Sequence, residues 1–430
     1  MTSQITAYDA DVLVVGGGPA GSMAGLTLAT MGVSTVLLDK KVFPRDKPCG
    51  GGIRHGVRRR FVALMKDLER RVPIHEISKV VMEAPSGVSV LAKLDQPLYL
   101  TFRRIEFDDA LLRDARAAGA RVIEGARVVT VERNERGVTV DCVDGRRFTA
   151  RGIIGADGVN SIVARAAGLT DGFSNAELAI DTMEETPLAE LGVTDTEAMY
   201  VAYGYKGWPG YGYVFPKRRC VDAGVGFLLP FFKETLGGAP YEHHARFVQE
   251  MSAKGVVRGR SNPDNFKAYR LPLCGPLPRT VAARAVVCGD AGGFVNAYTG
   301  EGIYYAMVSG EHAGLTLAEA LKDDDLSARR LAAYETRWRQ EIGEELSDAV
   351  RIQRRIFANP ALVDRIIRAA AVDERLCRLF ARVALGEERL RQRKLEMTCR
   401  FVLATLRARF RAWNRRRLPG APRRSSGGRS

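Results

Sequence analysis

Short apolar runs bounded by glycine open the chain. Residues 11–15 (DVLVV) form one such run, and an apolar, Ala-rich stretch follows the next glycines to about Met31. A second run at 33–39 (VSTVLLD) ends at Asp39. Apolar runs of this length between turn signals are typical of strands buried on both faces of a parallel sheet. The pattern therefore predicts a strand, a helix and a second strand in this part of the chain.

Strand and helix patterns then alternate through the rest of the sequence. Turn signals such as NERG and DGRR separate the strand-like runs, and 3.6-residue periodicity indicates the helices. The segment 176–273 is rich in alternating aromatic strands, and beyond Leu326 the chain has a helical pattern with a loop at 358–360. The individual elements expected are strands at 121–125, 127–133, 137–143, in the first half of 151–161 and at 285–289, and helices at 111–118, 241–253 and 302–321.

The composition indicates a globular protein of two or three domains. The chain has 430 residues, of which 46% are hydrophobic and 27% charged, so a sizeable core can form. No basic region precedes the first apolar run, no stretch approaches 18 apolar residues, and the seven cysteines include no CxxC pair. We therefore expect a cytoplasmic chain with free thiols and without a signal peptide, a spanning helix or a metal site.

The net charge of +15 is concentrated at the C-terminus. Residues 390–430 carry thirteen lysines and arginines and one acid, which gives this segment a net charge of +12. Apolar residues recur between the arginines at helical spacing, namely Phe401, Val402, Leu406, Phe410 and Trp413. This pattern is typical of an interfacial helix, and it predicts an anionic membrane surface as partner, with the protein peripheral at the inner face of the membrane.

Two alternatives stay open for this C-terminal segment. The helix at 399–417 could dock on the body of the protein instead of on a membrane. Nucleic acid would tolerate the charge, but nothing else in the sequence supports it, and we expect no nucleic-acid partner. Residues 418–430 contain Pro, Gly, Ser and Arg with little apolar surface to bury, so a disordered basic tail is expected.

The first motif with a chemical meaning is GGGPAG at 16–21. It lies between a predicted strand and a predicted helix, and Asp39 ends the next strand 18 residues after Gly21. Gly16, Gly18 and Gly21 suit a tight turn, a close backbone approach to a pyrophosphate and close helix packing, while the acid can bind a ribose hydroxyl. The motif predicts dinucleotide binding; the alternative is a tight strand–helix turn that binds nothing.

A second glycine-rich segment separates FAD from NAD. CGDAGG (288–293) follows a predicted strand, and TGEGI (299–303) opens a predicted helix. Asp290 can bind a ribityl chain, and the amides of Gly300–Gly302 can stabilise negative charge that develops on a reduced flavin. An NAD enzyme with a single Rossmann unit has no use for this second site, so FAD is the expected cofactor.

Together these motifs resemble the para-hydroxybenzoate hydroxylase superfamily of FAD proteins. GADGVNS (155–161) and the run Arg104-x-x-Phe107-Asp108-x-x-Leu111 fit the same superfamily, and the resemblance covers residues 8–321. Arg104 could instead be a surface residue at a strand end, and Asp157 a turn former. The resemblance implies that the following residues lie on or near FAD: Gly16, Gly18, Gly21, Asp39, Arg104, Val128 (by its backbone), Asp157, Asp290, Gly302 and Ile303.

FPRDKPCGGG (43–52) is similar to a segment of the geranylgeranyl reductases that runs beside the flavin. In this resemblance Cys49, Gly50 and Gly52 join the cofactor site, and the glycines let the backbone lie against the cofactor where any Cβ would clash. GYGYVFP (210–216) and DAGVGF (222–227) resemble the substrate motif of that family and the strand after it, although Tyr213 stands where Trp is usual and Ala297 where Pro is usual.

The family reaction implied is reduction of isolated prenyl double bonds with hydride from flavin N5. Cys49 could donate the proton, could pack on the isoalloxazine, or could be an inert thiol. Tyr211, Tyr213 and Phe215 share one strand face, as tunnel lining or as ordinary core aromatics. The electron donor could be NADPH, NADH or a ferredoxin. Neither the prenyl substrate nor the oligomeric state follows from the sequence.

Two other functions remain open. One is an FAD-dependent monooxygenase acting on an aromatic or polyprenyl substrate, or a related halogenase. The other is a non-catalytic, membrane-associated flavin electron carrier. A basic cluster follows the glycines at Arg54, His55 and 58–60. We expect it to form a solvated helix face, with a diphosphate or phospholipid headgroup contact as the alternative.

The expected fold class is α/β. A Rossmann-like FAD-binding domain of the glutathione reductase type carries an inserted, mixed antiparallel β-sheet domain for the substrate, and a helical region follows at the C-terminus. The boundaries we predict are 8–75, 101–172 and 281–322 for the FAD-binding domain, 76–100 and 173–280 for the substrate domain, 323–417 for the C-terminal helices and 418–430 for the tail.

Overall fold

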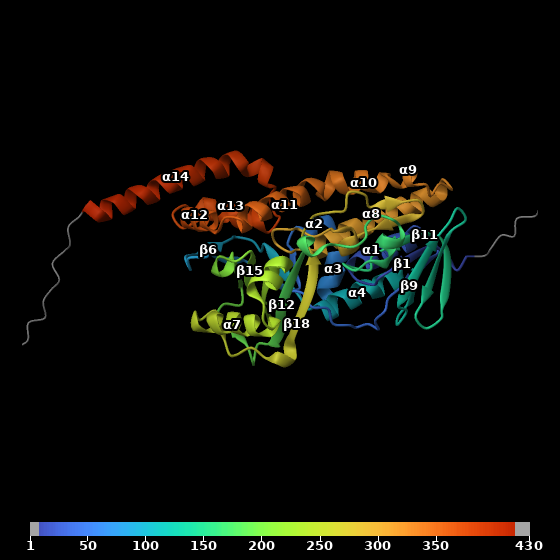
Figure 1. Ribbon diagram of the computed structural model, residues 1–430, viewed down its shortest axis with the longest axis horizontal. Helices are drawn as coiled ribbons and strands as arrows, with labels where there is room; N and C mark the ends of the chain where they lie inside the picture. Colours follow the sequence, from blue (N-terminus) through green and yellow to red (C-terminus); the bar gives the residue numbers. More distant parts are fainter. Residues whose placement is uncertain (1–7, 418–430) are drawn as a thin grey trace, which may run out of the picture.

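Two large sheets and a layer of C-terminal helices make up the architecture (Figure 1). The computed structural model describes residues 8–417, with side chains as far as Arg407; the tail predicted at 418–430 lies outside this range. The first sheet has eight strands: β1 (Ala10–Val15), β2 (Thr35–Leu38), β8 (Arg121–Ile123), β9 (Val128–Arg133), β10 (Val138–Cys142), β11 (Arg147–Gly155), β19 (Val281–Ala282) and β20 (Ala285–Val287).

The centre of the first sheet is parallel, in the order β20-β11-β1-β2-β8. The buried runs that predicted strands here are continuous, because helices and loops cover both faces. Parallel strands bring their carboxyl ends to one edge of the sheet, where ligands of open α/β sheets bind. Gly16, Asp39, Ala156 and Cys288 directly follow four of these strands, so they gather at that edge.

The second large sheet is antiparallel except for the parallel pair β14 and β5. Its order is β18-β12-β16-β15-β14-β5-β6. The strands of this sheet are β5 (Lys79–Glu83), β6 (Ser89–Lys93), β12 (Leu178–Pro187), β14 (Ala198–Tyr203), β15 (Gly210–Pro216), β16 (Cys220–Leu228) and β18 (Phe266–Pro272). One small sheet contains β3 (Gly52–Arg54), β7 (Tyr99–Thr101) and β4 (His75–Ile77). Another pairs β13 (Gly192–Val193) with β17 (Val257–Arg258).

Helices cover both sheets. Two of them, α1 and α8, cross closely at Gly310. A Cβ at this residue would lie 2.1 Å from the carbonyl oxygen of Ala20, so only glycine permits this approach. The helices of the body are α1 (Pro19–Thr30), α2 (Val57–Arg60), α3 (Val62–Arg71), α4 (Arg104–Ala117), α5 (Ile162–Ala166), α6 (Leu229–Phe231), α7 (Pro240–Ala253) and α8 (Ile303–Lys322). Those of the C-terminal region are α9 (Ala328–Leu331), α10 (Ala333–Trp338), α11 (Glu344–Phe357), α12 (Pro360–Ala370), α13 (Glu374–Ala384) and α14 (Leu390–Arg417).

The C-terminal helices form one layer along the molecule, drawn at the top of Figure 1. Tyr334 and Trp338 of α10 are buried in the core around α1 and α8. Val363 and Ile367 of α12 are buried against the second sheet. One layer therefore closes the same side of both sheets.

The structure confirms the predicted fold class, while the domain boundaries stay a prediction. The helix α4 differs from its predicted bounds: it begins at Arg104 and not near Leu111. The run from Arg104 to Leu111 is its first two turns, with Phe107 and Leu111 both buried at i, i+4 spacing. Polar residues between these two positions concealed the helical period in the sequence.

Candidate functional site

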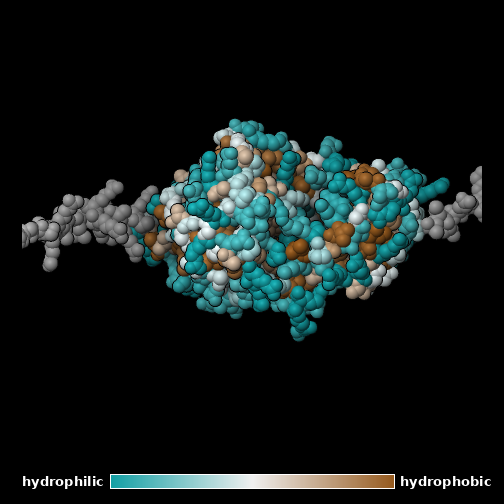
Figure 2. All heavy atoms as spheres, turned by 90° about the horizontal axis from the view of Figure 1, so that it is seen from below, coloured by the Kyte–Doolittle hydropathy of each residue, from teal (hydrophilic) through white to brown (hydrophobic). Residues whose placement is uncertain are grey.

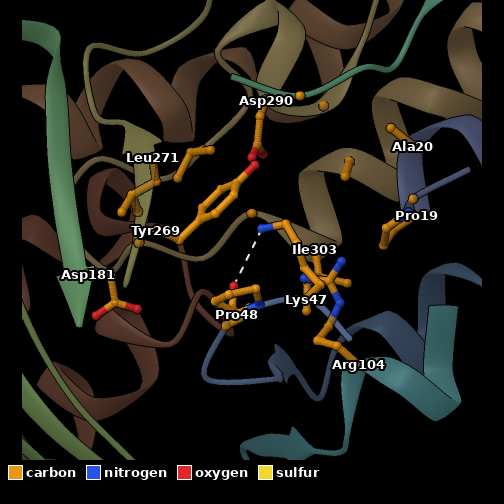
Figure 3. Close-up of a pocket in the computed structure, with 18 of the residues that line it drawn as sticks. Pro19, Ala20, Lys47, Pro48, Arg104, Asp181, Tyr269, Leu271, Asp290 and Ile303 are labelled. Carbon is orange, nitrogen blue, oxygen red and sulfur yellow. Dashed lines mark hydrogen bonds between the residues drawn. The ribbon is translucent and has the colours of Figure 1, made fainter. Parts of the chain in front are cut away.

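A cavity of about 760 Å³ lies at the carboxyl ends of the parallel strands and extends to the second sheet (Figure 3). Its volume falls within the roughly 300–1,000 Å³ range of small-molecule sites. All residues predicted to bind cofactor or substrate line it except Gly21, which lies beneath the loop. The lining residues among those predicted are Gly16, Gly18, Asp39, Cys49, Gly50, Gly52, Arg104, Val128, Asp157, Tyr211, Tyr213, Phe215, Asp290, Gly300, Gly302 and Ile303.

The first glycine-rich loop has the shape of a diphosphate cradle. Gly16 has a φ of +106°, and a Cβ on Gly21 would lie 1.7 Å from the carbonyl oxygen of Gly16. At Gly18 the nearest atom to an added Cβ is Arg45 Nη2 at 3.6 Å, so this glycine faces open cavity. The carboxylate of Asp39 accepts hydrogen bonds from the amides of Gly17 at 2.6 Å and Lys41 at 2.7 Å. Protein atoms therefore pack against the loop at Gly16 and Gly21, while Gly18 faces the open cavity, as binding of a dinucleotide requires.

The second loop presents the start of α8 to the same cavity. Asp290 lies in a 3₁₀ turn at Gly289–Gly292, and its Oδ1 is 3.6 Å from the position of a Cβ on Gly302. Gly302 precedes the first residue of α8, and no side chain caps this helix. The free amides and the positive end of the helix dipole therefore face the cavity, where they can stabilise negative charge on a flavin ring.

Asp157 and Arg104 line the cavity but are engaged with other protein groups. The carboxylate of Asp157 accepts hydrogen bonds from the Ser161 hydroxyl at 2.5 Å and the Ile162 amide at 2.7 Å, which makes it a cap for the start of α5. Arg104 is buried and donates to both carboxylate oxygens of Asp108 at 2.7 Å. Against the effect of burial, the guanidinium groups of Arg104 and Arg45 lower the pKa of Asp108. The interpretation of Arg104 as a surface residue was wrong.

The three glycines of the CGGG segment contact protein where a side chain would stand. A Cβ on Gly50 would lie 3.0 Å from the Phe215 ring, and one on Gly52 would lie 2.2 Å from Tyr99. Gly51 has a φ of +64°, and its Cβ would lie 2.2 Å from the carbonyl oxygen of Phe102. Protein groups therefore occupy the space beside these glycines, most closely at Gly51 and Gly52, while the approach of their backbone to the flavin stays a prediction.

The predicted aromatic residues of β15 form a row along the cavity. Ring centroids are 6.0 Å apart for Tyr211 and Tyr213 and 4.6 Å apart for Tyr213 and Phe215. The Tyr211 hydroxyl donates a 2.6 Å hydrogen bond to the carbonyl of Thr299. The second sheet therefore contacts the second loop through Tyr211 and the CGGG segment through Phe215, and the row lines the cavity. Cys49 is half-buried between these regions, with the Arg104 guanidinium beside it.

Other residues of the site were not singled out from the sequence. The Lys47 ammonium lies 3.5 Å from the centre of the Tyr269 ring, and burial lowers the pKa of Lys47. Figure 3 shows Lys47, Tyr269 and Asp290 pointing toward one another, while Asp181 reaches the cavity from another strand. Lys47 lies inside the FPRDKPCGGG segment, which was a signal that could have been used. Asp181 and Tyr269 carried no motif.

Arg54, the first residue of the basic cluster after the glycines, does not lie on a solvated face. Arg54 is 4% exposed and pairs with Glu301 at 2.6 Å and Glu345 at 2.9 Å. The other three arginines also pair with acids: Arg58 with Glu69 and Glu76, Arg59 with Glu387, and Arg60 with Glu311 and Glu341. The expectation of a solvated helix face was therefore wrong for Arg54, which holds the loop of Glu301 to α11.

Known proteins agree with this geometry. A family model described as FAD binding domain matches residues 9–349. Conditioned medium factor receptor 1 of Dictyostelium discoideum is 28% identical over 392 residues, which cover 86% of this chain and 75% of that protein. Digeranylgeranylglycerophospholipid reductase 1 of Methanothermobacter thermautotrophicus is 31% identical over 360 residues, which cover 81% of this chain and 87% of that protein.

A solved structure has the same fold. The geranylgeranyl bacteriochlorophyll reductase-like protein of Thermoplasma acidophilum superposes with a TM-score of 0.75 over 90% of this chain and 98% of that chain, at 20% identity. The cradle at Gly18 and the open start of α8 fit FAD, and the family model confirms FAD as the cofactor. This chain belongs to the geranylgeranyl reductase family of FAD-dependent oxidoreductases.

Proposed function

We propose that this protein reduces isolated carbon–carbon double bonds of a prenyl lipid. The observation that carries the proposal is one continuous cavity that joins the FAD cradle at Gly18 to the aromatic row on β15. Reduced FAD supplies hydride when bound. The similarity to proteins named digeranylgeranylglycerophospholipid reductase supports a substrate with geranylgeranyl chains.

The wall beyond the aromatic row suits a hydrocarbon chain. It is apolar and draws on the second sheet, on neighbouring loops and on the end of α11, which excludes water from an alkene that has no carbonyl to polarise it. Its apolar members are Ala179, Phe227, Leu228, Leu271, Leu273, Val295 and Phe357.

An anaerobic titration tests the proposed reaction. The bound FAD is reduced with dithionite, a geranylgeranyl lipid is added, and flavin absorbance and product mass are followed. We expect reoxidation of the flavin without oxygen and a mass gain of two hydrogens for each double bond. Product that forms only with oxygen and an aromatic substrate would contradict the proposal in favour of a monooxygenase. Absence of turnover with either substrate would favour an electron carrier.

We further propose that α14 brings the protein to an anionic membrane surface. The helix docks on the body through Met397, Phe401 and Ala404, while its outward side exposes four apolar residues. Exposed fractions are 79% for Leu395, 50% for Val402, 51% for Leu403 and 56% for Leu406. Both sequence alternatives thus find support on different sides of one helix; the side chains of Phe410 and Trp413 lie outside the described range.

Charge and surface hydropathy support this orientation of the protein on the membrane. The segment that contains α14 carries the +12 charge, which anionic headgroups attract. The opposite face of the molecule, seen in Figure 2, is mostly hydrophilic, with hydrophobic side chains in scattered groups. Within residues 8–417, no helix is long and apolar enough to span a bilayer.

Replacing both Val402 and Leu406 with aspartate should lower partitioning to vesicles that contain phosphatidylglycerol by about tenfold or more, since each buried apolar side chain is worth roughly 1.5–3 kcal/mol. Co-sedimentation measures the bound fraction. The matched control replaces Val62 and Val143, each 65% exposed and far from α14 in sequence, with aspartate. Equal losses in the two variants would contradict a specific role of α14.

A further inference from the structure

Asp181 is a carboxylic acid in the apolar part of the cavity. It lies on β12, is half-buried, and lines the cavity together with Tyr213 and Leu271. The Tyr213 hydroxyl donates a 3.1 Å hydrogen bond to Asp181 Oδ2. Within the described residues no other hydrogen bond or ion pair reaches this carboxyl, so most of its hydrogen-bonding capacity faces the cavity.

A glycine in the middle of β16, Gly224, makes this contact possible. β16 lies between β15 and β12, with Gly224 opposite Tyr213 and Gly226 opposite Asp181. A Cβ on Gly224 would lie 2.3 Å from Tyr213 Cζ. The phenol therefore crosses over β16 at the glycine to reach the next strand. Glycine within a strand costs roughly 0.5–1 kcal/mol relative to alanine, so the sequence gives up stability to seat this tyrosine beside Asp181.

The surroundings of Asp181 stabilise its protonated form relative to that of an exposed aspartate. Burial raises the pKa of Asp181 to about 6, and the Tyr213 hydrogen bond, His244 and Lys47 oppose this shift only in part. The other titratable groups that face it are Tyr211 and, through the same strands, Asp222. A hydrocarbon chain in the cavity would displace water and raise the pKa further, because desolvation disfavours the carboxylate.

We propose that Asp181, oriented by Tyr213, is the acid that protonates the alkene. This inference rests on the proposed reduction of prenyl double bonds. The π electron pair of the alkene takes the proton from the Asp181 carboxyl to form one C–H bond, and the other alkene carbon accepts the hydride that reduced FAD supplies. The alkene is reduced, the cofactor is oxidised, and the Asp181 carboxylate regains a proton from water.

The first test follows the carboxyl itself. Infrared titration of the holoenzyme between pH 4 and 8 without substrate should show a protonated carboxyl band that is lost with a midpoint near pH 6 and is missing in Asp181→Asn. In Tyr213→Phe the band should persist with a shifted midpoint, since a hydrogen bond to the carboxylate is lost. A spectrum of Asp181→Asn identical to that of the wild type at every pH would overturn the proposal.

The second test uses single-turnover reoxidation of the reduced flavin by a geranylgeranyl lipid without oxygen. The Asp181→Asn rate should fall about 100-fold or more, as general acids contribute roughly 10²–10⁴-fold, while FAD content stays unchanged. The wild-type rate should fall as pH rises, because the acid form is consumed, and the variant should lose this limb. In Cys49→Ala the fall of the rate with rising pH should persist, because the thiol is not the acid that is consumed.

The outcomes separate the two proposals. If the wild type reduces prenyl lipids and Asp181→Asn does so within threefold of its rate, the acid assignment is wrong and the reductase proposal stands. A 100-fold loss in Cys49→Ala with a normal rate in Asp181→Asn would assign the proton to the thiol. If no prenyl lipid reoxidises the wild-type flavin, the reductase proposal fails and the acid assignment fails with it.

Discussion

Replacing Arg54 with methionine should lower the free energy of unfolding by about 3–5 kcal/mol, the usual cost of removing one partner from a buried ion pair. The variant leaves Glu301 buried, after its Oε2 has lost the Nε and Nη2 donors of Arg54 at 3.1 and 2.6 Å. Glu345 loses the same partner. Urea unfolding of the apoprotein, followed by circular dichroism, measures the change.

A neighbouring arginine gives the matched control for this experiment. Arg59 pairs with Glu387, but its side chain is 66% exposed, so Arg59→Met should cost about 1 kcal/mol or less. In the double variant Arg54→Met/Glu301→Gln, much of the lost stability should return, because the fully buried carboxylate is then neutral and Glu345 keeps the Tyr305 hydroxyl as a donor. Equal losses for Arg54→Met and Arg59→Met would show that burial of the first pair has no energetic consequence.

Alanine at Gly18 and at Gly21 should both abolish FAD binding, for different reasons. At Gly21 the added Cβ would stand 1.7 Å from the Gly16 carbonyl oxygen, so the loop must distort. Overpacking of this kind costs roughly 1–3 kcal/mol or more, and the apoprotein should become less stable. At Gly18 the Cβ meets only Arg45 Nη2 at 3.6 Å, so the apoprotein should keep its stability within about 0.5 kcal/mol.

Two measurements on each purified variant distinguish these cases. The ratio of flavin to protein absorbance gives the FAD content, and thermal unfolding of the apoprotein gives its stability. We expect both to fall for Gly21→Ala and only the FAD content to fall for Gly18→Ala. Full FAD content in Gly18→Ala would show that the cofactor does not approach the backbone at this residue.

The parts of the site that sequence could predict are those built from local signals. Gly16 and Gly18 lie in one turn, and Asp39 ends the next strand, so spacing alone placed them together. Asp290 and Gly302 followed the same logic in the second loop. The aromatic row on β15 was visible because strand residues two apart share a face. In each case the informative neighbours lie within about 25 residues of one another in the chain.

The remaining parts depend on neighbours that are distant in the sequence. Arg54 lies among five basic residues, which favoured a solvated face, but its partners Glu301 and Glu345 are 247 and 291 residues away. Asp181 became recognisable only when the register of three strands placed it near Tyr213. A single acid in a strand carries no signal of its own, because the chemistry arises from which strand lies beside it.

The ion pairs of Arg54 also bear on how the protein is made. Arg54 leaves the ribosome well before Glu301, Glu345 and Gly386, whose carbonyl accepts a hydrogen bond from Arg54. Until then, the guanidinium must stay hydrated, and the strand that carries it cannot be buried without an uncompensated charge. Nascent chains that end before Gly386 should therefore not retain flavin, so the cofactor is captured only after this residue has been synthesised.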